Sequence, residues 1–301
     1  MQEFAGQLAF ITGGASGAGL GQAKVFGRTG CRIVIADIRQ QAIDQAVAEL
    51  KAEGIAAHGI QLDITDRAAY AAAANEVEAV FGQAPTLLFN TAGVNNFGPI
   101  ERTTYGDFDW LIGVNLGGVI NGMVTFVPRM IASGKPGHVV TVASLGGFTG
   151  SALAGPYSAA KAAVVNLMEG YRQGLEKYGI GVSVVCPANI KSNIAEATLT
   201  RTAAYGETGY VEGEAAIASL NSIYQHGMEP EVLAAHVMKG VQDNSLYIIP
   251  YPETKDMLAA HFAQIVDSIP GIETDPEGAK QRIDALMAWA QGGAKVFTEG
   301  R

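Results

Sequence analysis

Short apolar runs alternate with longer amphipathic stretches along most of the chain, and this rhythm constrains the fold more than any other feature. The short runs are rich in β-branched residues, which is typical of strands buried on both faces. Seven strands are predicted, at Leu8–Thr12, Arg32–Asp37, Ala56–Asp63, Thr86–Asn90, His138–Ala143, Gly181–Cys186 and Leu246–Pro250. Helices are predicted between them, at Gly19–Thr29, Gln40–Glu53, Asp66–Phe81, Asp107–Ala132, Tyr157–Tyr178 and Glu229–Asp243. Buried strands joined by crossover helices predict an α/β protein with a doubly wound parallel sheet covered on both faces.

Two segments fall outside this rhythm. Residues 1–250 hold all seven expected strands and are expected to form one domain, but residues 187–230 make a long connection before the last strand. An insertion there lies beyond the carboxyl ends of the strands, where open α/β sheets bind ligands, so it is a candidate lid. Residues 251–301 carry two more amphipathic stretches, around Phe262 and Leu286. They predict a helical extension that packs on the core, covers the mouth of the site or contacts another subunit.

Composition and charge restrict the class of partner. Of the 301 residues, 48% are hydrophobic and only 16% are charged, which supplies enough apolar surface for a sizeable core. The net charge of −9, without a Lys/Arg-rich run, argues against a nucleic-acid or anionic membrane partner and favours a small molecule. No uninterrupted apolar run approaches the roughly 18 residues of a membrane span. The first residues lack the basic region of a signal peptide, so a cytoplasmic protein is expected.

The cysteines and histidines do not form a metal-binding or redox motif. Cys31 and Cys186 stand far apart without CxxC spacing, so both are expected to fill the core. The five histidines are scattered, without an HExxH motif or a Cys/His cluster. No metal site is therefore predicted.

A glycine-rich segment follows the first strand and opens the first helix. Gly13, Gly17 and Gly19 allow a tight turn, close approach of a pyrophosphate and contact with helix N-terminal amides. Asp37 ends the second strand, where a carboxylate accepts hydrogen bonds from an adenosine ribose diol and repels a 2′-phosphate. NAD is therefore favoured over NADP. Arg39 keeps NADP open as the alternative. A guanidinium at this position can cover the adenine, can bind a 2′-phosphate or can be an ordinary solvated charge.

Two further groups follow expected strands and should share the same sheet edge. Asp63 ends the third strand, where it contacts adenine or, equally, serves as an N-cap or turn carboxylate. The Asn90-Thr-Ala-Gly93 segment ends the fourth strand and is expected to support the cofactor from beneath through its backbone.

A tyrosine and a lysine four residues apart indicate proton transfer. Tyr157 and Lys161 lie on one face of an expected helix, about 6 Å apart along its axis. A nearby ammonium favours the phenolate and lowers the pKa of tyrosine from its ordinary value of about 10. The pair therefore predicts a base for an alcohol.

Together these residues resemble the short-chain dehydrogenase/reductase family over roughly Leu8–Pro250. The matching motifs are Thr12-Gly-x-x-x-Gly-x-Gly19, Asn90-x-Ala-Gly93, Asn115, Ser144 and Tyr157-x-x-x-Lys161. The sequence departs from the family pattern at Leu20 for isoleucine, Thr91 for asparagine and Pro187-Ala188 for Pro-Gly. None of these changes removes a reacting group, although the last alters the backbone beside the nicotinamide.

The resemblance implies a Rossmann fold and a set of site residues. It makes Tyr157 the acid/base, Lys161 its activator and a ligand of the nicotinamide ribose, Ser144 the residue that positions the substrate oxygen, and Asn115 the holder of a water that links Lys161 to solvent. The alcohol loses hydride as negative charge builds on its oxygen, where Tyr157 and Ser144 offer hydrogen bonds. The implied NAD contacts are Thr12, Gly13, Ser16, Gly17, Ala18, Gly19, Leu20, Asp37, Ile38, Asp63, Ile64, Asn90, Ala92, Gly93, Tyr157, Lys161, Pro187, Ile190 and Ser192.

Two other classes of function compete with this one. A serine hydrolase would use Ser144, but Val142 stands where the Gly-x-Ser-x-Gly elbow requires glycine, and no paired histidine stands out. A cofactor-sensing module without turnover remains an alternative, although such a protein usually loses part of the acid/base group, and all four positions are filled here.

A finer resemblance concerns the substrate. Asn95-Asn-Phe-Gly-Pro99, the segment Pro187–Asn193 and the C-terminal extension are similar to the Cα-dehydrogenases of bacterial lignin β-aryl ether breakdown. This implies NAD-dependent oxidation of the benzylic alcohol of a β-O-4 aryl glycerol ether, in a homodimer or homotetramer. Another bulky secondary alcohol, of steroid or hydroxyacyl type, is the alternative. The expected substrate contacts are Asn95, Phe97, Ser144, Phe148, Tyr157, Asn189, Asn193 and Tyr205, for which core packing and loop capping are the competing interpretations.

Overall fold

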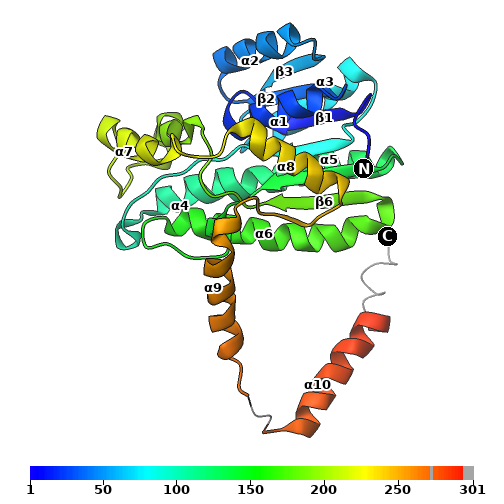
Figure 1. The fold of residues 1–301 in the computed structure, drawn as a ribbon, viewed down its shortest axis with the longest axis vertical. Coiled ribbons are helices and arrows are strands. Elements are labelled where there is room, and N and C mark those ends of the chain that lie inside the picture. Colours follow the sequence, from blue (N-terminus) through cyan, green and yellow to red (C-terminus); the bar gives the residue numbers. More distant parts are fainter. Residues whose placement is uncertain (272–273, 294–301) are drawn as a thin grey trace. The chain divides into compact units, whose positions relative to one another are not determined.

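The computed structural model describes residues 1–271 and 274–293 and contains a seven-stranded parallel sheet (Figure 1). The strand order is β3-β2-β1-β4-β5-β6-β7, which confirms the predicted doubly wound fold. The strands are β1 Leu8–Thr12, β2 Arg32–Asp37, β3 Ala57–Gln61, β4 Leu87–Asn90, β5 Gly137–Val142, β6 Ile180–Val185 and β7 Tyr247–Ile248. Every predicted strand is present, but β3 ends before Asp63 and β7 is shorter than expected.

The sheet changes its direction of winding at β1. This strand pairs with β2 on one side and with β4 on the other, so that Thr12 lies opposite both Ala36 and Asn90. In such sheets the loops that follow the two neighbouring strands run to opposite sides, which opens a crevice at the carboxyl edge. The residues at the carboxyl end of β1 therefore lie where this fold binds ligands.

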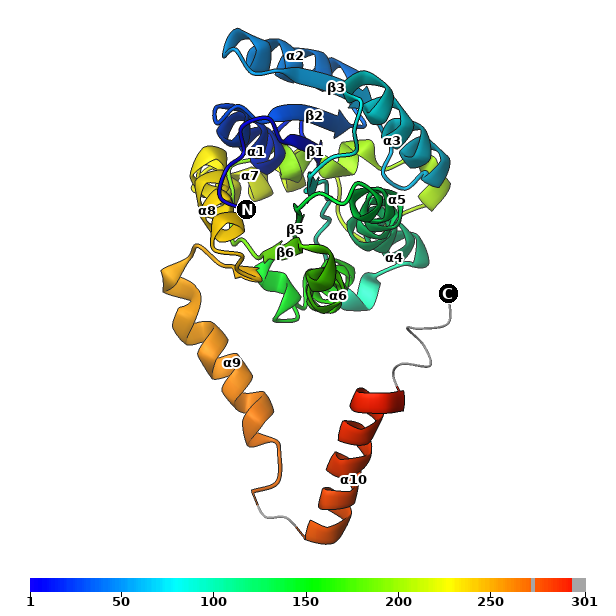
Figure 2. The ribbon, with the colours of Figure 1, turned by 90° about the vertical axis from the view of Figure 1, so that its right-hand side faces the viewer.

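Helices cover both faces of the sheet (Figure 2). Helices α1 (Gly17–Gly27), α2 (Gln40–Ala52) and α8 (Pro230–Gln242) pack in one core cluster, and α3 (Arg67–Phe81), α5 (Gly118–Ala132) and α6 (Gly155–Leu175) pack in another. Successive residues of β1 alternate between the two cores, with Phe10 in one and Ile11 in the other. This double burial explains why the strands read as continuous apolar runs. Cys31 and Cys186 are free and buried in these cores, as predicted.

The single helix predicted at Asp107–Ala132 is wrong in detail. The chain forms α4 (Tyr105–Ile112), a π-helical turn at Gly113–Gly117, and α5. A capping box fixes the start of α4, because the Thr104 side chain accepts a hydrogen bond from Asp107 N and the Asp107 side chain accepts one from Thr104 N. The helical stretch Tyr105–Ala132 reaches the length and hydropathy of a membrane span, contrary to the expectation from uninterrupted runs, although 56% of its most apolar window is buried in the fold.

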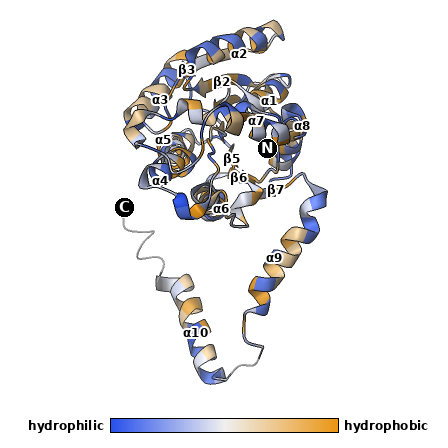
Figure 3. Cartoon of the chain, turned by 90° about the vertical axis from the view of Figure 1, so that its left-hand side faces the viewer, coloured by the Kyte–Doolittle hydropathy of each residue, from blue (hydrophilic) through white to orange (hydrophobic). Residues whose placement is uncertain are grey.

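Two segments lie outside the sheet and its covering helices. The connection from β6 to β7 forms the 3₁₀ segments η5 (Asn193–Thr200) and η6 (Ala203–Tyr205), then α7 (Glu214–Tyr224). The chain divides into two compact units, Met1–Pro252 and Glu253–Arg301. In the second unit, α9 (Lys255–Asp267) and α10 (Pro276–Ala288) are followed by a π-helical turn, Trp289–Gly293. Hydrophobic residues recur along both helices in Figure 3, and Phe262, Ile265, Ile283 and Leu286 are exposed.

Candidate active site

The glycine turn after β1 is too closely packed for side chains. Gly13 and Gly17 have φ angles of +64° and +49°, which other residues rarely adopt. A Cβ on Gly13 would lie 2.8 Å from Ala92 Cα, one on Gly17 2.8 Å from Ser192 Cβ, and one on Gly19 2.2 Å from Gly13 O. The turn therefore presents bare backbone where α1 begins, and this cradle fits the predicted pyrophosphate site. Ala18 and Leu20 pack partly buried against the core beneath it.

Thr12 ties the glycine turn to the loop after β4. Its Oγ1 donates a hydrogen bond to Phe89 O at 3.3 Å and accepts from Thr91 N at 3.0 Å and Ala92 N at 3.2 Å. Thr91, the residue that departs from the family pattern, donates from Oγ1 to Gln22 Oε1 of α1 at 2.6 Å. Its hydroxyl thus fixes the loop to α1. The side chain of Asn90 is buried and donates to Thr141 Oγ1 of β5 at 3.2 Å.

Arg39 forms an ion pair with Asp37 and so is not a freely solvated charge. Its Nε donates to Asp37 Oδ1 at 3.0 Å, and its Nη2 donates to Asp37 Oδ2 at 3.2 Å and to Ser16 Oγ at 2.9 Å. The hydrogen bonds to Asp37 raise the pKa of Arg39. Because Asp37 already balances the guanidinium, this pairing favours a ribose diol over a 2′-phosphate. The neighbouring Ile38 is exposed.

Asp63 acts as a turn carboxylate, one of the alternatives that the sequence left open. Its Oδ1 accepts from Thr65 N at 2.9 Å and from Thr65 Oγ1 at 2.7 Å, beyond the end of β3. Asp66, and not Asp63, caps α3. The next residue, Ile64, is buried, and its carbonyl oxygen accepts from Asn121 Nδ2 at 2.9 Å. Adenine contacts by Asp63 and Ile64 stay predictions.

Ser144, Tyr157 and Lys161 converge beyond the carboxyl end of β5. Ser144 follows β5 and its Oγ accepts from Gly146 N at 3.0 Å, which caps the 3₁₀ turn η3 (Leu145–Gly147). Tyr157 lies in the first turn of α6, and the Ser144 hydroxyl acts on its pKa. The Lys161 Nζ lies 5.7 Å from the centroid of the Tyr157 ring and donates to Val142 O at 2.9 Å. The turn after β5 and the start of α6 thus place a hydroxyl, a phenol and an ammonium together.

Burial dominates the titration of this group. It raises the pKa of Tyr157, which the hydrogen bond from Ser144 only partly offsets. It also lowers the pKa of Lys161, to about 8. The sequence predicts that Lys161 lowers the pKa of the phenol, but the pKa of Tyr157 is raised, because desolvation of the phenolate outweighs the hydrogen bond from Ser144.

The Asn115 side chain holds the loop after β4 and donates both of its amide hydrogens to main-chain carbonyls. It lies in the π-helical turn and not on a regular helix, it is buried, and its Nδ2 donates to Leu111 O and to Val94 O, each at 2.9 Å. Its Oδ1 accepts from Val94 N at 3.1 Å. The water that would link Lys161 to solvent through Asn115 stays a prediction. A Cβ on Gly93 would lie 2.8 Å from Asn115 Oδ1, so this loop packs directly on the π-helical turn.

The loop after β6 carries the remaining cofactor candidates. Pro187 O accepts from Leu145 N at 3.0 Å, and Ile190 forms a bridge with Met228. Ser192 Oγ donates to Ile190 O at 3.4 Å, and its Cβ borders Gly17. The Pro187-Ala188 departure thus leaves a loop that is anchored to the turn after β5 and lies against the glycine turn.

Of the candidate substrate residues, the structure brings Asn95 and Phe97 close to the acid/base group. The rings of Phe97 and Tyr157 are 6.5 Å apart, centroid to centroid, and Asn95 Nδ2 donates to Tyr224 Oη at 2.8 Å. Tyr224, the last residue of α7, was missed, because nothing in its local sequence distinguishes it from an ordinary helical tyrosine.

The other candidate substrate residues have contacts with residues outside the acid/base group, or are exposed. The Phe148 ring lies 6.3 Å from the ring of Tyr247, and Tyr205 packs in a small cluster with Trp110. Asn189 and Asn193 are exposed, and the Asn189 carbonyl accepts from Met228 N and Tyr251 Oη. Packing and loop roles therefore account for these residues, and their substrate contacts stay predictions.

The candidate lid is docked on the loop after β4 and on α4. Asn96 Nδ2 donates to Glu212 Oε1 at 3.2 Å. The buried Asp107 accepts from Gly209 N at 3.1 Å and lies 3.6 Å from Arg201 Nη2. Burial raises the pKa of Asp107, but hydrogen bonds from Thr208, Thr104 and Gly209 outweigh it and lower the pKa overall.

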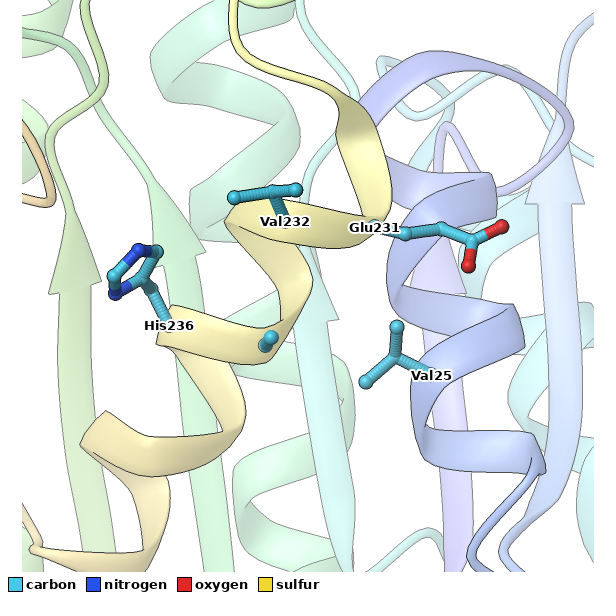
Figure 4. A pocket seen from close by; sticks show the side chains of 5 residues that line it. Val25, Glu231, Val232 and His236 are labelled. Carbon is cyan, nitrogen blue, oxygen red and sulfur yellow. The ribbon is translucent and has the colours of Figure 1, made fainter.

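A surface hollow elsewhere contains none of the predicted site residues. Figure 4 shows it between α1 and α8, lined by Val25, Glu231, Val232, Ala235 and His236. Glu231 there forms an ion pair with Arg28 at 2.5 Å. Within residues 1–271 and 274–293, His, Cys, Asp and Glu side chains form no group of three that could hold a metal ion.

The sequence matches known proteins over most of its length. The short chain dehydrogenase family model matches residues 7–202. The chain is 72% identical over 300 residues to a C alpha-dehydrogenase of Sphingobium sp. (strain NBRC 103272 / SYK-6), an alignment that covers 100% of this chain and 98% of that protein.

Solved structures give the same result. The apo form of LigD from Sphingobium sp. strain SYK-6 matches with a TM-score of 0.77 and 64% identity, over 90% of this chain and 100% of that chain. A short chain dehydrogenase/reductase from Burkholderia phymatum in complex with NAD matches with a TM-score of 0.82 and 28% identity, over 91% of this chain and 99% of that chain. The chain therefore belongs to the short-chain dehydrogenase family of oxidoreductases.

Proposed function

We propose that this enzyme uses NAD to oxidise the benzylic Cα alcohol of a lignin-derived β-O-4 aryl ether to the ketone. The observation that carries the reaction is the cluster of Ser144, Tyr157 and Lys161 beside the glycine turn. The substrate is supported by the full-length identity of 72% to a protein named C alpha-dehydrogenase. The Asp37–Arg39 pair and the NAD complex of a related structure support the choice of cofactor.

The residues of the site divide into those that would hold the cofactor and those that would handle the proton. The turn Gly13–Leu20 with Thr12 would hold the pyrophosphate, Asp37 the adenosine ribose, and the loops at Gly93 and Ser192 the nicotinamide side. Bound NAD would accept the hydride from the alcohol carbon. Ser144 and Tyr157 both present hydroxyls to the alcohol oxygen, and Tyr157 takes the proton as negative charge develops there.

Lys161 supplies the positive charge that the buried phenol requires. Burial raises the pKa of Tyr157, so a base at neutral pH needs cationic neighbours. Val142 O accepts one hydrogen from Lys161 Nζ, which leaves two ammonium hydrogens for the nicotinamide ribose. In this role Lys161 stabilises the phenolate and positions the cofactor together.

The enzyme's setting is part of the same proposal. Its reaction would reduce intracellular NAD to NADH, which supports a cytoplasmic location. The negative net charge supports a small aromatic alcohol as the partner in place of nucleic acid or an anionic membrane. A homodimer or homotetramer is proposed from the family resemblance, with the exposed apolar residues of α9 and α10 as supporting evidence.

The decisive experiment supplies purified protein with NAD and each stereoisomer of guaiacylglycerol-β-guaiacyl ether. We expect ketone and NADH to form in equal amounts from at least one isomer. Tyr157→Phe should bind NAD normally and lose at least about 100-fold in turnover, the scale of general acid–base catalysis. NAD binding without conversion of any alcohol would favour a cofactor sensor, and conversion of a steroid alcohol but no ether isomer would favour the alternative substrate class.

A further inference from the structure

The loop after β4 and the lid helix α7 meet at a polar pair close to Tyr157. Asn95 Nδ2 donates to Tyr224 Oη at 2.8 Å, although 129 positions separate the two residues. The same loop carries Phe97, whose ring faces that of Tyr157. Burial raises the pKa of Tyr224 to about 12, and the charge of Tyr157 contributes to the rise, so the two phenols lie within electrostatic reach of each other. The pair therefore borders the space where the alcohol reacts.

Each member of this pair can form one more hydrogen bond, Asn95 as an acceptor and Tyr224 as a donor. Asn95 is 2% exposed, and its Oδ1 is buried without a hydrogen-bond partner among the described residues. Tyr224 accepts the hydrogen bond from Asn95, which leaves its own O–H free to donate. A buried amide oxygen without a partner is costly, and such groups normally find one. A donor and an acceptor side by side match an alcohol hydroxyl, which accepts from Tyr224 and donates to Asn95.

We propose that Asn95 and Tyr224 form a subsite for a second hydroxyl of the substrate, next to the alcohol that is oxidised. This inference rests on the proposed function and narrows its substrate class to diols. An aryl glycerol ether carries a primary hydroxyl on Cγ, two carbons from the reacting Cα, whereas a 1-aryl-2-aryloxyethanol lacks it. Tyr224 acts as a positioning residue, since a phenol with a pKa of about 12 stays protonated near neutral pH.

The test compares these two substrates on the same enzyme samples. Wild type should prefer the aryl glycerol ether in kcat/KM. Tyr224→Phe should lower kcat/KM for the glycerol ether at least about tenfold, mainly through KM, because a hydrogen bond to the bound hydroxyl is lost. It should leave the aryloxyethanol within about twofold. Asn95→Leu, which keeps similar volume and removes both polar atoms, should show the same selective loss.

The control is another tyrosine far from the pair. Tyr178 is 43% exposed and stands just before β6, at the amino edge of the sheet. Tyr178→Phe should leave both substrates unchanged. The ratio of the two kcat/KM values does not depend on the fraction of folded enzyme, so partial unfolding of a variant does not imitate a selective loss.

Two outcomes would overturn the subsite while leaving the proposed function intact. The first is equal conversion of both substrates by wild type. The second is an equal loss on both substrates in Tyr224→Phe and Asn95→Leu, which would assign the pair to support of the reacting centre. If wild type converts neither substrate, the proposed function itself fails and the subsite fails with it.

Discussion

Replacing Asp107 by asparagine tests whether a buried charge holds the lid to the body of the enzyme. Asp107 is fully buried, and its Oδ2 accepts from Thr104 N, Thr104 Oγ1 and Gly209 N at 2.9 to 3.1 Å. Its other oxygen lies 3.6 Å from Arg201, whose side chain is only 7% exposed. The asparagine amide has only one oxygen. Its NH₂ group would therefore face either the three donors from Thr104 and Gly209 or the guanidinium of Arg201.

The expected cost follows from this geometry. Removing one partner of a buried ion pair costs about 3–5 kcal/mol, and the lower end applies because 3.6 Å is too long for a direct hydrogen bond. About 3 kcal/mol corresponds to a fall in Tm of roughly 6–12 °C for a protein of this size. The assay is thermal and urea unfolding of wild type and Asp107→Asn. Asp109→Asn, on an exposed position of the same helix, should change stability by less than about 0.5 kcal/mol.

The stability that Asp107 contributes should depend on pH in a definite direction. The pKa of Asp107 is lowered in the folded state, so its stabilisation is complete above the unfolded pKa of about 3.9 and is lost as pH falls through the folded value. The stability gap between wild type and Asp107→Asn should therefore be constant near neutral pH and narrow below about pH 4. A gap under about 0.5 kcal/mol at pH 7 would refute the reasoning, as would a gap that does not narrow in acid.

Further predictions concern the cofactor site. Gly17→Ala should raise the KM for NAD about tenfold, because the new Cβ meets the lid and the backbone has a φ of +49°. Gly174→Ala, in open space on α6, should leave this KM unchanged. Equal KM values in the two variants would contradict the role of the glycine turn as a pyrophosphate site. Asp37→Asn releases Arg39, so the NAD-to-NADP preference in kcat/KM should fall at least about tenfold, and an unchanged preference would show that the pair does not select the cofactor. Burial lowers the pKa of Lys161 to about 8, so Lys161→Met should raise the free energy of unfolding of the cofactor-free protein at pH 7. In urea unfolding, this gain in stability should shrink as pH rises from about 8 toward 10.5. A gain that does not depend on pH would contradict the burial of this charge.

The sequence predicted the sheet well because its strands are buried on both faces. Continuous apolar runs such as Leu8–Thr12 leave little room for another interpretation, and the glycine spacing fixes the first turn. The π-helical turn around Asn115 could not be predicted in this way, because the apolar pattern runs through it without interruption. What makes the turn is a tertiary contact, the hydrogen bonds between Asn115 and Val94 of the loop after β4.

The site was predicted where its chemistry is local in sequence and missed where it is not. Tyr157 and Lys161 are one helical turn apart, so their pairing follows from spacing alone. Tyr224 meets Asn95 across 129 positions, and only the docked lid brings them together. The direction of the Tyr157 pKa shift was also out of reach, because burial of the phenol depends on the packed loops around it.

The most direct test of the account follows the hydrogen on Cα. Purified enzyme would be given NAD and an aryl glycerol ether deuterated at Cα, with the products analysed by mass spectrometry. We expect ketone and singly deuterated reduced cofactor in equal amounts, with both lost in Tyr157→Phe. Ketone formed without deuterium in the cofactor, or full activity in Tyr157→Phe, would contradict it.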